Sequence, residues 1–168
     1  MPRYRRHFGR NQTVFLTLVT GNRRKWLREP GQKGELLNML RKVPERFRVR
    51  NTAYVLLDDH LHWLFRANNT DIPRLVTALK QRMNFERRDA GLPWRGLWQN
   101  RYFDHIIRDE DDFRIHLDYI HYNPVKHGYV RSAPEYPWSS FQCWVRRGVY
   151  DSDWGVNAVP KVSTLDFE

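Results

Sequence analysis

The sequence predicts an α+β fold of the ferredoxin-like, split βαβ type, in which an antiparallel sheet carries two helices on one face. Segments of strand length alternate with segments of helical periodicity in the order β-α-β-β-α-β, followed by an added helix and a C-terminal extension. The 168 residues, 40% of them hydrophobic, suffice to bury the core of one ordinary domain. No stretch approaches the roughly 18 uninterrupted apolar residues of a membrane-spanning helix, so we expect no contact with a membrane.

The first half of the chain predicts three strands and one helix. Residues 12–20 are rich in apolar and β-branched types and indicate a buried strand. Apolar residues then recur at helical spacing over 36–47, where Pro44 should kink or end the helix. Two further strands are expected on either side of a tight turn formed by two aspartates, over residues 51–58 and 61–67.

The second half predicts another helix and the last strand. Thr70 or Asp71 can cap this helix, and Pro73 suits its first turn. Residues 101–109 indicate the fourth strand. We expect one functional domain with an extension packed on it, over residues 1–128 and 129–168.

The charge distribution indicates a polyanionic partner. The chain has 29 basic and 19 acidic residues, a net charge of +10, and its first 50 residues hold 14 of the basic groups but only 3 acidic ones. Arginine outnumbers lysine 23 to 6, which favours bidentate contacts with phosphates and bases. Nucleic acid is the usual partner of such a surface, although a merely well-solvated surface explains the composition equally well. Cys143 is the single cysteine, so no internal disulfide can form and a cytoplasmic location is expected.

The first candidate site is the sequence His60-Leu61-His62 at the start of a predicted strand. Side chains at i and i+2 share one face of a strand, so both imidazoles point the same way. Two adjacent imidazoles provide half of a divalent metal site. A pair of half-buried structural histidines is the alternative interpretation.

The second candidate site is the helix that Asp109 starts and that Asn123-Pro124 should end. At 100° per residue, one stripe is apolar and should face the core: Phe113, Leu117 and Ile120. The adjacent face is polar: Asp112, His116, Tyr119 and Asn123. Tyr119 lies one turn before Asn123, whereas the competing Tyr122 points away from it. The alternative is an ordinary solvated face with a tyrosine at its edge.

These two motifs resemble those of a known family. His60-Leu61-His62 resembles the His-hydrophobic-His (HUH) motif of single-strand DNA nucleases. The segment 119–128, YIHYNPVKHG, closely resembles the tyrosine signature of REP-associated tyrosine transposases, relatives of the single-tyrosine transposases of small bacterial insertion sequences. Residues 98–103 and 136–141 also look like blocks of this family, and the resemblance spans residues 3 to 155.

The resemblance implies a metal-dependent DNA nickase and strand transferase. Tyr119 would attack a phosphodiester and form a 5′-phosphotyrosine, while His60, His62 and Asn123 would bind the metal. Such an N,N,O ligand set suits Mg²⁺ or Mn²⁺. Because the phosphotyrosine conserves the bond energy, the same site could rejoin strands without ATP.

The resemblance also implies the partner, a single-stranded hairpin from a repetitive extragenic palindrome (REP) with a short guide sequence at its foot. Basic side chains interleaved with aromatic ones suit such a ligand. We expect a monomer, with a dimer as the alternative, located in the cytoplasm and associated with the nucleoid. The candidate DNA contacts are Arg3, Tyr4, Arg5, Arg6, Arg23, Arg24, Arg82 and Arg101, with Arg87 and Arg88 beside Arg82.

Two other functions compete with this one. A structural binder that grips DNA hairpins without cleaving them would need the basic N-terminal half but neither the histidine pair nor Tyr119. An RNA-binding ferredoxin-like module would need paired aromatic residues on its central strands, for which Phe15 and Tyr54 are weak candidates.

Overall fold

The computed structural model describes residues 11–156 and 160–167 and confirms the predicted α+β fold. Its four strands form one antiparallel sheet in the order β2-β3-β1-β4. The two central strands are therefore the ones that hold residues 12–20 and the histidine pair. The strand bounds are Gln12–Val19 (β1), Val49–Leu56 (β2), His60–Ala67 (β3) and Phe103–Ile106 (β4).

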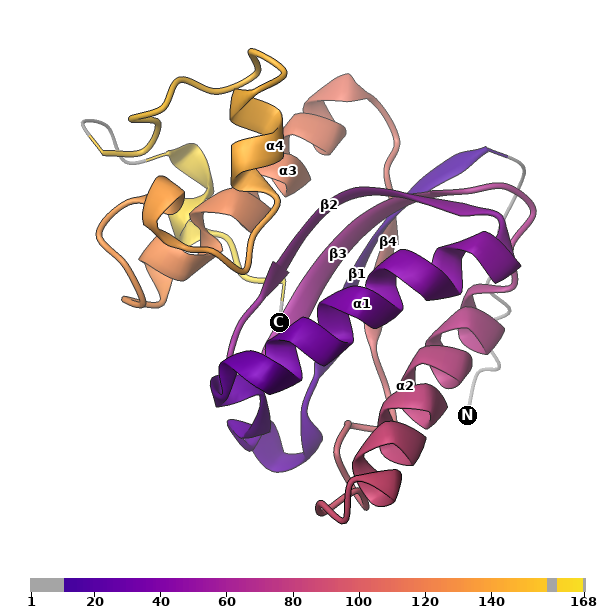
Figure 1. The fold of residues 1–168 in the computed structure, drawn as a ribbon. Helices are drawn as coiled ribbons and strands as arrows, with labels where there is room; N and C mark the ends of the chain where they lie inside the picture. The colour runs from indigo at the N-terminus through magenta and orange to yellow at the C-terminus, as the bar shows by residue number, and fades with distance from the viewer. Residues whose placement is uncertain (1–10, 157–159, 168) are drawn as a thin grey trace.

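Helices cover both faces of the sheet (Figure 1). Helices α1 and α2 pack on one face, as the split βαβ pattern requires, and α3 lies on the other. Short 3₁₀ turns and α4 complete the structure. The helix bounds are Pro30–Phe47 (α1), Ile72–Asp89 (α2), Glu110–Lys126 (α3) and Phe141–Val145 (α4), with 3₁₀ turns at Gly21–Arg23, Trp26–Arg28, Ala133–Glu135 and Lys161–Thr164 (η4).

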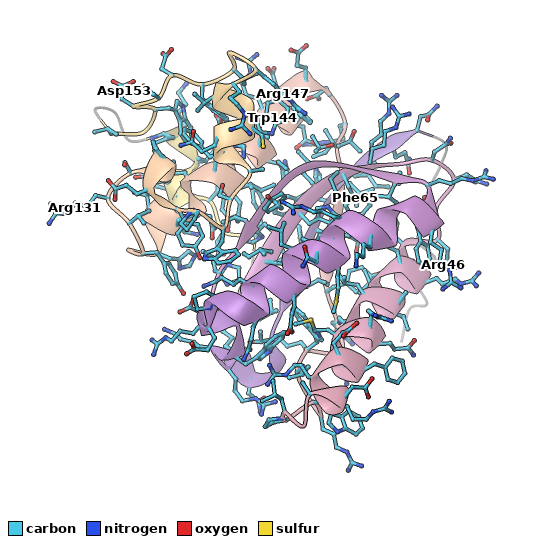
Figure 2. All side chains as sticks on the ribbon, viewed as in Figure 1. Arg46, Phe65, Arg131, Trp144, Arg147 and Asp153 are labelled. Atoms are coloured by element: carbon cyan, nitrogen blue, oxygen red, sulfur yellow. The ribbon has the colours of Figure 1, made fainter. Side chains whose placement is uncertain are left out.

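The alternation of β3 divides the core between the two faces. Trp63 and Phe65 belong to the cluster beneath α1 and α2, where Phe65 is labelled in Figure 2. Leu64 belongs to the cluster that contains Tyr119 of α3. Because His62 lies two residues before Leu64, it shares the face of the sheet that α3 covers.

Residues that follow α3 pack on this helix and along the outer strand β2. The backbone N–H of Leu56 donates to the carbonyl of Trp138, and the Trp144 indole donates to the carbonyl of Thr52. The Tyr150 hydroxyl donates to the Asp118 carboxylate at 2.6 Å. These contacts join the C-terminal part of the chain to the sheet and to the helix that carries the tyrosine signature.

Two prolines that could end a helix do not do so. Helix α1 runs past Pro44 to Phe47. Proline cannot donate to the carbonyl of Leu40 four residues earlier, and the side-chain amide of Asn51 donates to it instead, at 2.6 Å. The prediction that Pro124 ends α3 is wrong, since this helix continues to Lys126 with the proline buried inside it.

The start of α1 and the length of β4 also differ from expectation. Helix α1 begins at Pro30, six residues before the apolar repeat. Proline suits the first turn of a helix, and the helix tolerates Gly31 and Gly34 near this end. Strand β4 has four residues rather than nine, and among the described strands it pairs with β1 alone.

Basic side chains project from several parts of the surface. Arg46, Arg131 and Arg147 are exposed and extend outward in Figure 2. Within the described residues, no helix combines the length and apolar character needed to span a bilayer.

Candidate active site

The histidine pair is buried where β3 begins, beside the central strand β1. His60 and His62 are 1% and 0% exposed, and their ring centroids lie 4.9 Å apart. The register of the sheet places Thr17 of β1 directly opposite His62. The strand therefore presents both imidazoles on one face, as its period of two residues predicts.

Hydrogen bonds orient both rings. The Thr17 hydroxyl donates its single proton to the carbonyl of Phe167 at 2.8 Å, so Thr17 Oγ1 must accept from His62 Nδ1, also at 2.8 Å. Nδ1 of His60 lies 2.7 Å from Asp59 Oδ1, which only accepts when ionised. Both imidazoles thus carry their proton on Nδ1 and keep a lone pair on Nε2. Metal-binding histidines have the same arrangement when a hydrogen-bond acceptor holds the nitrogen that does not bind the metal.

The Asp59 carboxyl group has a lowered pKa, which favours the ionised form that accepts from His60. Burial raises the pKa of its carboxyl group, but the hydrogen bond from His60 and the guanidinium of Arg23 outweigh burial and hold the pKa below its usual value. Asp58, its neighbour in the turn, instead forms a buried ion pair with Lys33 at 2.6 Å. The two aspartates therefore have different roles: Asp59 orients His60, and Asp58 joins the turn to α1.

Helix α3 and the residue that caps its C-terminal end present three side chains to the histidine pair at intervals of four residues: Tyr119, Asn123 and His127. The Tyr119 ring lies 5.1 Å from the His62 ring, and the His127 ring lies 5.3 Å from the His60 ring. Asn123 sits between them on the helix and therefore faces the pair. It is 1% exposed, and neither its Oδ1 nor its Nδ2 has a hydrogen-bond partner among the described residues.

A buried amide without partners is costly, so Asn123 fits a site that binds a further group. Two imidazole Nε2 lone pairs and one amide oxygen form a suitable ligand set for a divalent cation. The residues present thus match the requirements of the metal that the resemblance implies.

The two candidate tyrosines lie in different surroundings. Tyr119 is 1% exposed and contacts Phe15 and His62, and the Lys126 ammonium lies 5.2 Å from its ring centroid. The Tyr122 ring lies 6.3 Å from the Trp154 ring, and it contacts the C-terminal segment rather than the histidine pair. The helical face that holds Tyr119 is buried, contrary to the interpretation as a solvated face.

Phe167 covers Tyr119. Its backbone N–H donates to Tyr119 Oη at 3.2 Å, and its ring lies 4.8 Å from the Tyr119 ring and 5.7 Å from Phe15. The Lys126 ammonium donates to the carbonyl of Leu165 at 2.7 Å and holds the preceding residues on α3. No local pattern in the sequence relates a residue near the C-terminus to a tyrosine 48 positions earlier.

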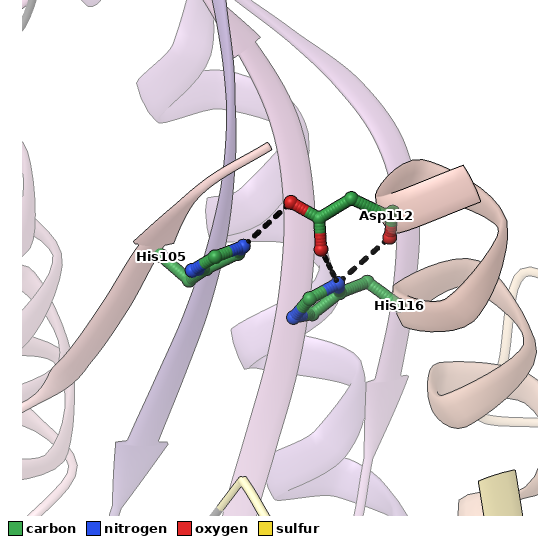
Figure 3. Close-up of side chains that lie close together, drawn as sticks. All are labelled: His105, Asp112 and His116. Carbon is green, nitrogen blue, oxygen red and sulfur yellow. Dashed lines mark hydrogen bonds and ion pairs between the residues drawn. The ribbon is translucent and has the colours of Figure 1, made fainter. Parts of the chain in front are cut away.

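A second cluster of histidines, not predicted from the sequence, joins β4 to α3: His105, Asp112 and His116 (Figure 3). One ligand atom from each side chain lies within 4.8 Å of the others, so the group can hold a metal ion. His105 Nε2 lies 2.8 Å from Asp112 Oδ2, and His116 Nδ1 lies 3.1 Å from Asp112 Oδ1. Asp109 caps α3 as expected, because its carboxylate accepts from the backbone N–H of Asp112. The Asp112 carboxylate contacts the two histidines of this cluster instead of capping the helix.

Two groups of this cluster, Asp112 and His116, have shifted pKa values. Burial raises the pKa of Asp112, but the N–H of Arg108, the His105 ring and the Arg108 guanidinium together lower it to about 2. Burial lowers the pKa of His116, and the other groups around this ring do not reverse that effect. A carboxylate and a neutral imidazole are therefore present at neutral pH.

The candidate DNA contacts are in varied settings. Arg23 pairs with Asp59, and Arg24 donates to the carbonyl of Gly96, while Arg82 pairs with Glu86 on the surface of α2. Arg101 is exposed. The expectation that Arg87 contacts DNA is wrong, because this side chain is buried over the Trp26 ring and donates to the Pro93 carbonyl. The N-terminal candidates lie outside the described residues: Arg3, Tyr4, Arg5 and Arg6.

Comparisons with known proteins agree with the fold and show the family. The profile of the family described as "Transposase IS200 like" matches residues 10–123. The REP-associated tyrosine transposase of Escherichia coli K12 is 34% identical over 92% of this chain and 91% of its own length. A relative in Haemophilus influenzae, assigned to the same group, is 33% identical over 96% of this chain and 98% of its own.

A solved structure extends the similarity to three dimensions. It is described as a REP-associated tyrosine transposase bound to a REP hairpin, and it superposes with a TM-score of 0.81 at 32% identity, covering 96% of this chain and 94% of that one. The chain therefore belongs to the IS200-like transposase family, and within it to the REP-associated tyrosine transposases.

Proposed function

We propose that this protein nicks and rejoins single-stranded palindromic hairpin DNA of the REP type through a covalent bond to Tyr119. The observation that carries the proposal is the arrangement of one helical face against one strand. Tyr119 lies beside His62, and the amide of Asn123, which has no hydrogen-bond partner in the part of the chain that the structure describes, faces the histidine pair. A relative of similar fold was solved with a REP hairpin, which supports the same class of DNA as substrate.

The nucleophile in this proposal is Tyr119 Oη. It attacks a phosphorus atom, the bond from phosphorus to the 3′-oxygen breaks, and the phenol loses a proton as the released 3′-oxygen gains one. The product is a 5′-phosphotyrosine, which a 3′-hydroxyl can attack to restore a phosphodiester. A phenol has a pKa of about 10, so the site must favour loss of its proton, and the nearby Lys126 ammonium stabilises a developing phenolate.

His60, His62 and Asn123 would hold the divalent cation, Mg²⁺ or Mn²⁺, of which imidazole ligands favour the latter. When bound, such a cation withdraws charge from the scissile phosphate. Asp59 and Thr17 keep the two imidazoles in the tautomer that ligates. We propose that the protein acts as a monomer.

An adduct assay tests this function. A labelled hairpin oligonucleotide, incubated with the protein and Mn²⁺, should yield a covalent complex that survives denaturation, together with a fragment that ends in a 3′-hydroxyl. A fully paired duplex of the same sequence should yield neither, and chelation of the metal should prevent the reaction. Binding of the hairpin without any adduct would contradict the proposal and support the structural binder.

The C-terminal residues should restrain this reaction. Phe167 donates to the attacking oxygen of Tyr119 and lies on its ring, so DNA can reach that oxygen only after Phe167 moves. A variant that ends at Thr164 should form the adduct faster than the full chain, by about 10-fold if displacing the tail costs about 1.4 kcal/mol.

A control separates access from a general change in activity. Replacing the exposed Thr164 with alanine leaves residues 165–167 in the chain and should have little effect on the rate. Equal rates for the full chain and for the truncated chain would show that Phe167 does not limit access.

A further inference from the structure

Four aromatic rings contact the phenyl ring of Phe167 on the face of the sheet that α3 covers. The rings of His116 and Phe103 lie nearly parallel to it, at angles of 18° and 21° and centroid distances of 4.7 and 6.2 Å. Those of Tyr119 and Phe15 lie across it, at 70° and 66° and at 4.8 and 5.7 Å. Aromatic pairs prefer both geometries, so these four residues, which we call the aromatic site, accommodate a flat ring.

The sheet and α3 hold the rings of the aromatic site in place. Phe15 of β1 is 0% exposed and lies opposite His105 of β4, and Phe103 precedes His105 by two residues on the same face. His116 Nδ1 lies 2.8 Å from the backbone carbonyl of Asp112, which only accepts, so the imidazole donates to it. The His105 ring stacks on His116 at 4.6 Å and 12° (Figure 3). A ligand ring would therefore meet a preorganised site.

DNA cleavage by Tyr119 requires Phe167 to leave the aromatic site. The Phe167 N–H donates to Tyr119 Oη at 3.2 Å, and its carbonyl accepts from the Thr17 hydroxyl at 2.8 Å. A phosphate that Tyr119 attacks must displace this backbone, and the phenyl ring moves with it. Its departure exposes the rings of Phe15 and Tyr119 to water, which is unfavourable unless another flat ring takes its place.

A nucleobase is the flat ring that bound DNA supplies. The base beside the scissile phosphate is tethered to it, and Tyr119, which would attack this phosphate, is itself part of the aromatic site. Bases of single strands stack readily on aromatic side chains, whereas a base paired within a duplex must first leave its stack. We propose that the aromatic site binds one unpaired nucleobase adjoining the scissile phosphate, in place of Phe167.

The surroundings of the aromatic site suit a strand of DNA. Phe103 is 42% exposed, so a base can reach it from solvent. Arg101 and Arg108 are exposed and lie just before and just after β4, where they can contact phosphates near the bound base. Arg108 pairs with Asp112, but its side chain is 75% exposed and can turn into solvent. This inference rests on the proposed function, because it places the scissile phosphate at Tyr119.

Stacking of a base can be measured without cleavage. Full-length Tyr119→Phe keeps the ring of the aromatic site but forms no adduct in the proposed mechanism. It is mixed with single-stranded hairpins that each carry 2-aminopurine, a base whose fluorescence falls on stacking, at one unpaired position. We expect a fall at the position beside the scissile phosphate, and the same fall at lower protein concentration when Phe167→Ala removes the competing ring.

Phe103 provides the variants that decide the test, because its ring is partly exposed and its substitution leaves the buried core unchanged. In full-length protein with Tyr119→Phe and Phe167→Ala, Phe103→Leu should abolish the fall and weaken hairpin binding about tenfold. Phe103→Tyr keeps the ring and should retain both. Phe85→Leu is the matched control and should change neither, since Phe85 is a 50% exposed phenylalanine of α2, on the other face of the sheet.

Two results would overturn the proposal: no fall at any unpaired position, or an equal fall in Phe103→Leu and Phe103→Tyr. Either of them, alongside a covalent adduct in the wild-type protein, would leave the proposed function standing. A fall that depends on Phe103, in a protein whose wild-type form yields no adduct, would support base binding at the aromatic site and contradict the proposed function.

Discussion

Replacing Tyr119 with phenylalanine is expected to abolish the protein–DNA adduct, a loss of at least about a thousandfold, because no other group replaces an absent nucleophile. Phenylalanine retains the ring that packs against Phe15, His62 and Phe167, so the fold should persist. The measurement is adduct formation on a labelled hairpin with Mn²⁺, together with hairpin affinity by gel mobility, which should stay within a few-fold of wild type.

Tyr122→Phe is the matched control for that variant. Its ring contacts Trp154 and lies beside Gly155, so the substitution removes a hydroxyl of the same helix at a distance from the histidine pair. The rate of adduct formation should remain close to wild type. A reversed pair of results, with Tyr119→Phe active and Tyr122→Phe inactive, would assign the nucleophile to the other tyrosine.

Replacing His62 with glutamine is the change with the second largest expected effect. The imidazole is buried against Thr17, Phe15 and Tyr119, and glutamine fills a similar volume without the Nε2 ligand. We expect adduct formation to fall at least about 100-fold while hairpin binding is retained. Excess Mn²⁺ should not restore the rate, because the ligand itself is missing.

Thr17→Val provides a graded comparison. It keeps the shape of the residue but removes the hydroxyl that accepts from His62 Nδ1, so the imidazole remains as a ligand without its orienting partner. Such partners are worth about 10–100-fold in metal affinity, and added Mn²⁺ should therefore recover much of the lost rate. If Thr17→Val and His62→Gln lost the same fraction of the rate, and added Mn²⁺ restored neither, His62 would act through packing alone.

Short-range patterns explain which parts of the fold could be predicted. The strand over residues 12–19 is apolar and β-branched, and the strand over residues 60–67 is rich in leucine and aromatic residues, so both can be recognised locally. The period of two then places both histidines on one face. The 100° period of a helix likewise groups Tyr119 with Asn123. Each of these inferences needs only residues within two turns or one strand.

Long-range contacts explain what could not be predicted. Thr17 is 45 positions from His62, and Phe167 is 48 positions from Tyr119, so neither contact follows from local spacing. The polar face of α3 is buried because it meets the histidine pair of the sheet, and a helical wheel cannot show that. Asp112 has the sequence context of a capping residue, and only the position of β4 brings His105 to it.

The central claim is that Tyr119 becomes covalently attached to DNA, and peptide mapping of the adduct tests it most directly. Trypsin should release residues 115–126 as one peptide that contains both Tyr119 and Tyr122, so fragmentation must locate the attached nucleotide. We predict a 5′-linked nucleotide on Tyr119 after reaction with a single-stranded hairpin and Mn²⁺. A nucleotide on Tyr122 or on any residue outside this peptide would contradict the account.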